Sequence, residues 1–274
     1  MAARLSYIHH ENCLKTLSRM PDDYVGLVIT SPPYNMNLRI SSQSDGSVRY
    51  HSRQIVKEIS SKYLGEFSDD LPEADYFEQH SEILRELIRV SDLVFYNVQV
   101  VTGSKRSIFK MIGEFSEYLK DIIVWDKGHA QPSIHGQVLN RVSELLLVFE
   151  KDFPQSRQYR DRGFFEKGSL DDIWRIKRQS MKKQFEQISQ SLGSQDTNIS
   201  HGASFPEELV EKILINFSTE GDLIYDPFMG TGTTAVVAKR LGRRWLGSEM
   251  SPQYTEFARE RIRRTTVGRQ EQLF

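Results

Sequence analysis

Two consecutive prolines end the apolar run over residues 27–30, in a segment that reads Leu-Val-Ile-Thr-Ser-Pro-Pro-Tyr-Asn. Such a run predicts a buried strand, and Pro32 and Pro33 end it because proline has no N–H to give to a central ladder. Each proline also holds the preceding residue extended, which makes Ser31 and Pro32 a rigid strand tip. We expect the ring of Tyr34 to face outward, so that a planar group stacks on it and donates N–H hydrogens to the tip oxygens.

By itself this tip is also typical of an ordinary strand exit, and a second segment, residues 223–234, decides how we interpret it. That segment reads as a strand, a glycine-rich loop and the start of a helix. Glycines let the backbone approach a ligand, and a helix N-terminus favours negative charge. The loop lacks the third glycine of a dinucleotide site and the Gly-Lys-Ser/Thr of a P-loop. Its threonines and N–H groups suit a compact carboxylate, and Glu249, which ends the next predicted strand, suits a ribose diol.

Together the two segments resemble the amino-methylating DNA methyltransferases, whose motifs are Ser/Asp-Pro-Pro-Tyr and Asp-Pro-Phe-x-Gly-x-Gly-Thr-Thr. The tip precedes the loop and a basic segment lies between them, which is the β arrangement of that family. The resemblance implies an α/β chain with the Rossmann-like fold of S-adenosylmethionine-dependent methyltransferases. That fold has a mostly parallel sheet with helices on both faces, here in permuted motif order and with a small DNA-recognition insertion. The resemblance spans nearly the whole chain and is weakest over residues 37–68 and 151–200.

The hydrophobic pattern supports this α/β reading, because predicted strands alternate with predicted helices. Helical spacing covers residues 73–90, 107–119, 206–217 and 251–262, and strands are predicted over 93–98, 121–126, 144–149, 223–226 and 244–249. We interpret the apolar side chains of these central elements as core and assign them no chemistry. A short strand, a turn and a helix start are predicted over residues 5–18.

We divide the chain into three parts. Residues 1–150 form the catalytic half, with a mobile loop over 37–68, and residues 201–274 form the cofactor-binding half of the same domain. Residues 151–200 form a DNA target-recognition insertion, since ten lysines and arginines stand against five acids between 151 and 183 and such cations contact phosphates. A solvated insertion with a small satellite core is the alternative. We expect residues 184–198 to be flexible. Loop 37–68 is either a lid that orders on DNA or a solvated loop with a short helix over 55–63.

The resemblance also implies site residues. It assigns the catalytic tip to Ser31, Pro32, Pro33 and Tyr34. It assigns cofactor contacts to Asn12, Cys13, Ser31, His201, Phe205, Asp226, Pro227, Phe228, Gly230, Thr231, Gly232, Thr233, Thr234 and Glu249. We expect DNA contacts from Arg39, Arg49, Arg53, Arg175, Lys177 and Arg178, and no metal site.

The chain departs from the family at the adenine end of the cofactor site, where Gly-Asp-Cys is replaced by Glu11, Asn12 and Cys13. Asn12 donates as well as accepts hydrogen bonds, so an adenine contact can survive the change. Cys13 lacks the Pro-Cys setting of the cytosine-C5 methylases, and we expect a small buried thiol instead of a nucleophile. We expect His201 to serve in structure or as a backbone contact, and not as a base.

Composition excludes several classes of protein. A single cysteine excludes an internal disulfide and a zinc cluster built on cysteines. No run of about 18 apolar residues is present, so we expect no membrane span, and without an apolar signal-peptide core we expect a cytoplasmic protein. The net charge of −1 argues weakly against nucleic acid, but local fields matter more than the total.

These features predict an enzyme that moves a methyl group from S-adenosyl-L-methionine to the exocyclic N4 amine of a flipped cytosine in DNA. In the family, a Ser-Pro-Pro-Tyr tip is usual for cytosine N4 and an Asp-Pro-Pro-Tyr tip for adenine N6, so adenine N6 is the alternative. Methylation of RNA or of a protein side-chain amide, and DNA binding without catalysis, are further alternatives. We expect sequence-specific binding of double-stranded DNA and a role as a restriction-modification methylase. A cognate nuclease, and a monomer or homodimer, are left open.

Overall fold

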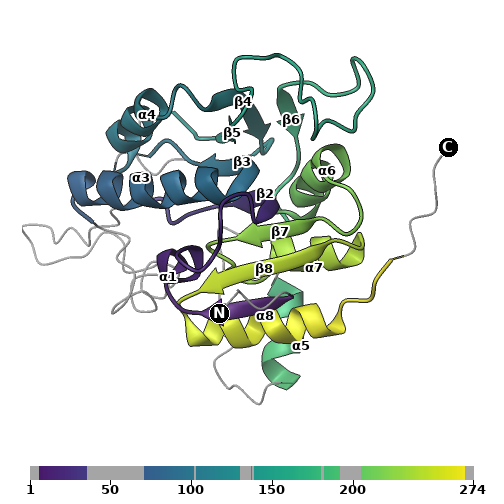
Figure 1. The fold of residues 1–274 in the computed structure, drawn as a ribbon. Helices are drawn as coiled ribbons and strands as arrows, with labels where there is room; N and C mark the ends of the chain where they lie inside the picture. The colour runs from purple at the N-terminus through teal and green to yellow at the C-terminus, as the bar shows by residue number, and fades with distance from the viewer. Residues whose placement is uncertain are drawn as a thin grey trace, which may run out of the picture.

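The computed structural model describes residues 6–35, 71–101, 103–129, 137, 139–179, 182–191 and 205–268. An eight-stranded sheet with the order β1-β8-β7-β2-β3-β5-β4-β6 runs through this part of the chain (Figure 1). Its strands are β1 (Tyr7–His10), β2 (Val25–Thr30), β3 (Ser91–Val98), β4 (Leu119–Asp126), β5 (Ser143–Glu150), β6 (Ile173–Arg175), β7 (Leu223–Asp226) and β8 (Arg244–Glu249). The expected lid and short helix of loop 37–68 lie outside the described residues.

Strand direction places the ends that carry chemistry at one edge of the sheet. Neighbouring strands are parallel, except that β5 runs antiparallel to both β3 and β4. The carboxyl ends of β1, β8, β7, β2, β3 and β4 therefore meet the amino end of β5 at the same edge. The predicted mostly parallel sheet is confirmed, and its antiparallel strand brings one more chain segment to this edge.

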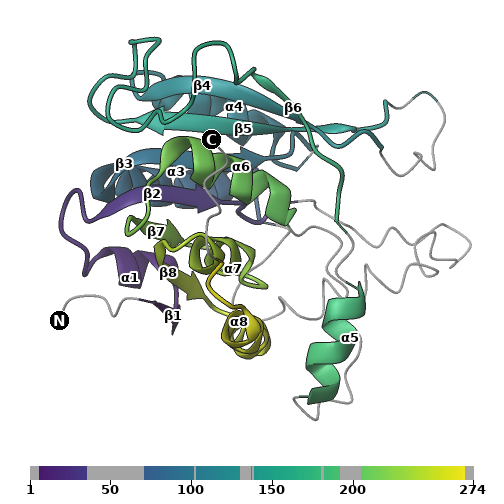
Figure 2. The ribbon, with the colours of Figure 1, turned by 90° about the vertical axis from the view of Figure 1, so that its right-hand side faces the viewer.

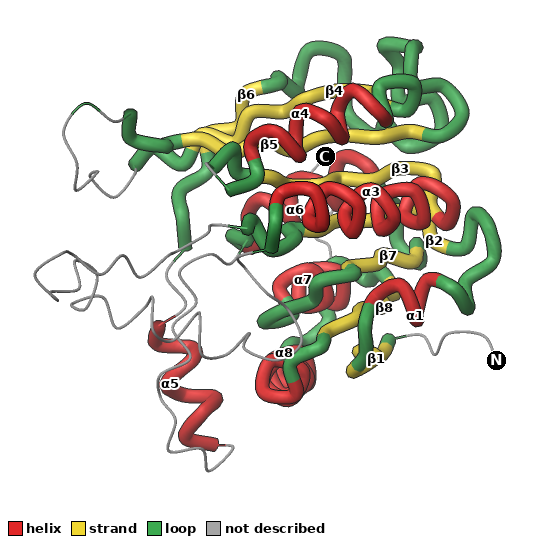
Figure 3. Tube along the Cα trace, turned by 90° about the vertical axis from the view of Figure 1, so that its left-hand side faces the viewer, coloured by secondary structure: helices red, strands yellow, loops and turns green. Residues whose placement is uncertain are grey.

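Helices cover both faces of the sheet, as Figures 2 and 3 show from opposite sides. One hydrophobic cluster packs α1, α3 and α4 on one face, and another packs α6, α7 and α8 on the other. The helices are α1 (Cys13–Leu17), α3 (Glu73–Val90), α4 (Lys105–Glu114), α5 (Lys182–Ser191), α6 (Glu207–Phe217), α7 (Thr233–Arg240) and α8 (Pro252–Arg264).

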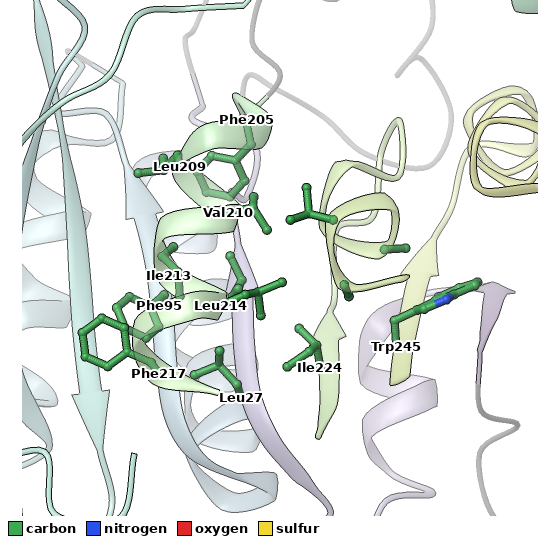
Figure 4. Packing of buried hydrophobic residues seen from close by; sticks show 14 of the residues in the cluster. Leu27, Phe95, Phe205, Leu209, Val210, Ile213, Leu214, Phe217, Ile224 and Trp245 are labelled. Carbon is green, nitrogen blue, oxygen red and sulfur yellow. The ribbon is translucent and has the colours of Figure 1, made fainter. Parts of the chain in front are cut away.

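Helix α6 shows how the sequence pattern makes this core. Leu209, Ile213 and Phe217 recur at the spacing that places residues on one helix face, and all three are buried. They pack in the same cluster as Leu27 of β2 and Ile224 of β7 (Figure 4). This packing fixes the two strands whose ends carry the tip and the glycine-rich loop.

Two sequence predictions differ from the structure. Helix α4 ends at Glu114 and not at 119, because Phe115 turns into the core and the chain then enters β4 at Leu119. We expected residues 184–198 to be flexible, but residues 184–191 of that segment belong to α5. In α5, Ile188 is buried and the Oγ of Ser191 accepts a hydrogen bond from Arg264 of α8. Contact with α8 explains why this polar segment forms a helix that its sequence did not predict.

The first part of the segment 151–200 belongs to the main sheet. Strand β6 pairs in parallel with β4, and Trp174 is fully buried. Tyr159 and Phe165 pack with each other and with Phe217 of α6. The role of this segment in DNA recognition stays a prediction. In the described ranges, no helix is both long and apolar enough to cross a membrane.

Candidate active site

The tip and the glycine-rich loop lie side by side because their strands, β2 and β7, are hydrogen-bonded neighbours. Thr30, the last residue of β2, donates a 3.0 Å hydrogen bond to Asp226, the last residue of β7. Asp226 also accepts from the backbone N–H of Phe228 at 3.0 Å and from Thr234 at 2.7 Å. Burial raises the pKa of Asp226 to about 6, against the effect of these donors. Its carboxylate thus holds the loop together, and the predicted cofactor contact of Asp226 stays a prediction.

The Tyr34 side chain lies inward, and the expectation that its ring faces outward was wrong. The residue is 9% exposed, and its hydroxyl donates a 2.7 Å hydrogen bond to Glu144 Oε2. A buried phenol needs a polar partner, and the amino end of β5 supplies one. Burial first, and then the charge of Glu144, raise the pKa of Tyr34 well above its ordinary value, so the phenol keeps its proton.

Polar side chains from β3, from β5 and from the residue that follows β4 complete this buried group. Asn97 of β3 donates from Nδ2 to the Tyr34 hydroxyl and to Glu144 Oε2, both at 2.7 Å. Lys127, which follows β4, donates to Glu144 Oε1 at 2.8 Å, and its side chain is fully buried. Burial lowers the pKa of Lys127 against the attraction of Glu144. We call Tyr34, Asn97, Glu144 and Lys127 the tip cluster.

The oxygens of the tip differ in how free they are to accept a hydrogen bond from a ligand. Ser31 is half-buried, and its Oγ lies 2.8 Å from the Tyr34 hydroxyl. The carbonyl oxygen of Pro33 already accepts a 2.8 Å hydrogen bond from the Tyr76 hydroxyl of α3. Of the two consecutive carbonyls at the tip, the Pro32 carbonyl is therefore the better candidate acceptor for a ligand.

An aromatic column, buried at Tyr76 and His80 and partly buried at Phe228, links the tip to the glycine-rich loop. The Tyr76 ring lies 4.0 Å from the His80 ring between centroids, and His80 stacks at 6.1 Å on Phe228 of the loop. His80 Nδ1 lies 2.6 Å from the Tyr96 hydroxyl. Burial lowers the pKa of His80 to about 3, so this imidazole is neutral and acts as a packing group.

The glycine-rich loop has the conformation that its sequence requires. Gly230 and Gly232 have φ values of +50° and +81°, in the left-handed region that favours glycine. Gly230 donates its N–H to Glu249 Oε2 at 2.7 Å, and Glu249 Oε1 accepts from Ser251 N at 2.8 Å. Burial raises the pKa of Glu249. A Cβ added at Gly230 would meet only the carbonyl oxygen of Phe228 at 3.8 Å, so this part of the loop faces open space.

Arg261 of α8 holds the other half of the loop. Its guanidinium donates to the Thr231 carbonyl at 3.1 Å, to Thr233 Oγ1 at 3.0 Å and to Glu207 at 2.7 Å. Burial lowers the pKa of Arg261, and the charge of Glu207 opposes this shift. A cation beside a helix N-terminus favours an anion nearby. The open space, the N–H groups and the acid at the end of β8 fit the carboxylate and ribose of S-adenosylmethionine.

The remaining predicted cofactor residues have mixed settings. Asn12 caps α1 by accepting from Leu14 N at 2.9 Å through Oδ1, so a cofactor contact would use its amide N–H group. Cys13 is 3% exposed, which confirms the expected buried thiol, and burial raises its pKa to about 12. Pro227 is buried, and Phe205 lies in the core next to the start of α6. His201 lies outside the described residues.

The predicted DNA contacts fall in two places. Arg175, Lys177 and Arg178 are exposed: Arg175 ends β6 at the sheet edge that carries the tip, and the other two follow it. Arg178 Nη2 lies 3.7 Å from Glu144 Oε1, so this strip begins beside the tip cluster. The other residues, Arg39, Arg49 and Arg53, lie outside the described part of the chain. No group of three metal-ligating side chains occurs among the residues that the structure describes.

Comparison with known proteins agrees with this arrangement. The model of the DNA methylase family, which covers N6 and N4 enzymes, matches residues 25–260. This chain belongs to the DNA methylase family. The methylase is 28% identical to the type II methyltransferase M2.DpnII of Streptococcus pneumoniae, over 92% of this chain and 88% of that protein.

Solved structures show the same fold. The structure of PvuII DNA methyltransferase, described as cytosine-N4-specific, superimposes with a TM-score of 0.67 at 17% identity and covers 94% of the methylase and 89% of that chain. The complex of M1.HpyAVI with S-adenosylmethionine gives a TM-score of 0.58 at 18% identity, covering 93% and 98%. The Rossmann-like fold is confirmed. The methylase acts on DNA and uses S-adenosylmethionine.

Sequence reasoning missed three residues of the site, Asn97, Glu144 and Lys127. We assigned the central elements to the core without chemistry, although Asn97 and Glu144 interrupt strands that are otherwise mostly apolar. A polar residue inside a buried strand needs a partner, and this was the available signal. The partners themselves depend on the antiparallel register of β5, which the sequence pattern does not specify.

Proposed function

We propose that the methylase transfers a methyl group to the exocyclic amine of a DNA base, and that this amine is N4 of cytosine. The observation that carries the proposal is the 3.0 Å hydrogen bond between Thr30 and Asp226. It joins the strand that bears the tip to the strand that bears the cofactor loop. A methyl donor held by the loop and an amine held at the tip are then neighbours.

The cofactor supplies a methyl group on a sulfonium, which is already activated for transfer. The chain has to hold a poor nucleophile in place, because the lone pair of an exocyclic amine is delocalised into the ring. Ser31 Oγ and the Pro32 carbonyl accept the two amine hydrogens and favour a pyramidal nitrogen with its lone pair forward. The new N–C bond would replace the C–S bond of the cofactor, which would leave as a neutral thioether, and the methylated nitrogen would lose one proton to water. Positioning of this kind supplies most of the rate.

An amine inside a duplex cannot reach the tip, so the target nucleotide must leave the stack. Ser31 is half-buried, Pro32 is buried and Tyr34 is 9% exposed, so the tip is only partly open to a base. The exposed strip of Arg175, Lys177 and Arg178 at the same edge suits phosphates of the flanking DNA. We assign this strip, within residues 151–200, to DNA binding.

Cytosine is proposed as the base because of Ser31. A serine at this motif position is usual for cytosine-N4 enzymes, and PvuII DNA methyltransferase is described with that specificity. Adenine presents an amine beside a ring nitrogen in the same way, and its N6 is the alternative. The relatives M2.DpnII and M2.LlaDCHI are named type II methyltransferases, which supports a restriction-modification role with a cognate nuclease.

A transfer assay tests the substrate class. The purified methylase is incubated with S-adenosylmethionine labelled with tritium in its methyl group and with duplex DNA, single-stranded DNA, RNA or a protein mixture. We expect label in DNA, incorporated more slowly when the Ser31→Ala variant is used. Label in RNA or protein with none in DNA would contradict the proposal.

A further inference from the structure

The tip cluster fixes the direction in which its hydrogen bonds run. The hydroxyl of Tyr34 has one hydrogen, and its oxygen lies 2.7 Å from Glu144 Oε2. Glu144 is paired with the ammonium of Lys127 at 2.8 Å, and an ionised carboxylate only accepts hydrogen bonds. The hydrogen of Tyr34 is therefore committed to Glu144.

Asn97 constrains the same oxygens from the other side. Its amide nitrogen lies 2.7 Å from the Tyr34 oxygen and 2.7 Å from Glu144 Oε2, and its two hydrogens serve these two contacts. The opposite orientation would set the amide carbonyl against the carboxylate, which is repulsive. The 3.4 Å separation from Ser31 Oγ is long for a hydrogen bond, and no third hydrogen exists for it.

Ser31 must then be the donor in its 2.8 Å contact with Tyr34, because Tyr34 has no hydrogen left to give. We propose that Glu144, paired with Lys127, orders Tyr34 and Ser31 so that Ser31 Oγ presents only lone pairs to the target amine. This inference rests on the proposed function and holds for either base.

This order matters because a serine hydroxyl can bind an amine in two ways. If Ser31 donated its hydrogen outward, it would bind the nitrogen lone pair, which is the pair that must attack the methyl carbon. When Ser31 donates its hydrogen to Tyr34, its Oγ can only accept a hydrogen bond from the amine N–H. Glu144 and Lys127 act through Tyr34, so they are positioning residues and do not touch the substrate.

The variant Glu144→Gln should reverse the direction of these hydrogen bonds without changing the shape of the side chain. The new amide oxygen would face Lys127, and its NH₂ group would donate toward Tyr34. Tyr34 would then donate to Ser31, and the Ser31 hydrogen would point outward. The matched control is Glu150→Gln, because Lys120 and Glu150 also form a buried Lys–Glu pair between β4 and β5, at 2.5 Å and at the opposite end of β5.

The first measurement is single-turnover methyl transfer, with cofactor affinity measured separately. We expect Glu144→Gln to slow transfer by about tenfold or more, comparable to a hydrogen bond with a charged group. Cofactor affinity should stay within about twofold. Tyr34→Phe keeps the ring and removes the acceptor of the Ser31 hydrogen, so it should show a similar loss, which also serves if Glu144→Gln does not fold. In the Tyr34→Phe background, Glu144→Gln should slow methyl transfer little further.

The second measurement is binding without turnover. The oligonucleotide carries the site that the protein methylates, with the target base unmethylated. That base is either intact or replaced by its keto counterpart, which is uracil for cytosine or hypoxanthine for adenine. A keto oxygen cannot donate to Ser31, so the wild-type protein should prefer the amine base. Glu144→Gln should narrow this preference, and Glu150→Gln should leave it unchanged.

If the wild-type protein methylates DNA and a folded Glu144→Gln variant transfers the methyl group at the normal rate, the proposed function stands but this inference is overturned. Equal slowing by Glu150→Gln, or fully multiplicative losses in the double variant, would also overturn it. Absence of DNA methylation by the wild-type protein would instead contradict the proposed function, and the inference with it.

Discussion

Thr30 at the end of β2 and Asp226 at the end of β7 share a 3.0 Å hydrogen bond between Oγ1 and Oδ1, although 196 residues separate them in the sequence. The bond connects the strand that carries the tip to the strand that carries the cofactor loop. Asp226 binds Thr234 and Phe228 N as well. A single carboxylate thus fixes both the loop and its distance from the tip.

The pH dependence of stability should report on Asp226. Burial raises its pKa from 3.8 to about 6, so the folded protein binds this proton more tightly than the unfolded chain. Its contribution to the free energy of unfolding is complete below about pH 4 and is lost as the pH rises through 6, by up to about 3 kcal/mol. Urea unfolding of wild type and Asp226→Asn from pH 4 to 7 measures this. Parallel profiles for the two proteins would contradict the assignment.

Glu249→Ala should weaken S-adenosylmethionine binding. The ribose would lose a charged acceptor worth about 1.5–3 kcal/mol, and Gly230 N would lose its 2.7 Å partner. Titration calorimetry on the folded variant gives the affinity, with Glu256→Ala on the exposed side of α8 as the matched control. Unchanged affinity in Glu249→Ala would remove this residue from the cofactor site.

Charge reversal at Arg175, Lys177 and Arg178 should weaken DNA binding and flatten its dependence on salt. With fewer phosphate contacts, binding releases fewer counterions from the DNA. Cofactor affinity should not change. The control reverses Arg157, Arg160 and Lys167, which are exposed in the same segment. An unchanged slope of log affinity against log salt would return residues 151–183 to the alternative of a solvated insertion.

The fold and the identity of the two motifs were predictable because they depend on local rules. Prolines end β2, glycines with positive φ form the loop, and apolar periodicity marks most of the helices. The orientation of Tyr34 was not predictable, since its partners Asn97 and Glu144 come from strands 63 and 110 residues away. Likewise α5 is ordered by a contact with α8, which no local pattern in its polar sequence encodes.

Substitutions at the tip separate direct transfer from covalent catalysis. Ser31→Ala should slow methyl transfer more than it weakens cofactor binding, because its hydrogen bond matters most at the transition state. Tyr34→Ala should also slow transfer, because it disrupts the tip cluster and removes the hydroxyl that lies 2.8 Å from Ser31 Oγ. Cys13→Ser should keep most activity, since the buried thiol forms no adduct. Single-turnover assays with tritiated cofactor measure all three, and an inactive but folded Cys13→Ser protein would contradict direct transfer.

The identity of the methylated nucleoside tests the central claim most directly. DNA methylated in vitro by the purified protein is digested to nucleosides, and the products are separated and weighed by mass spectrometry against standards. Transfer to an amine held by Ser31 and Pro32 predicts N4-methylcytosine, and N6-methyladenine would keep the amine mechanism while changing the base. A C5-methylated cytosine would contradict the account.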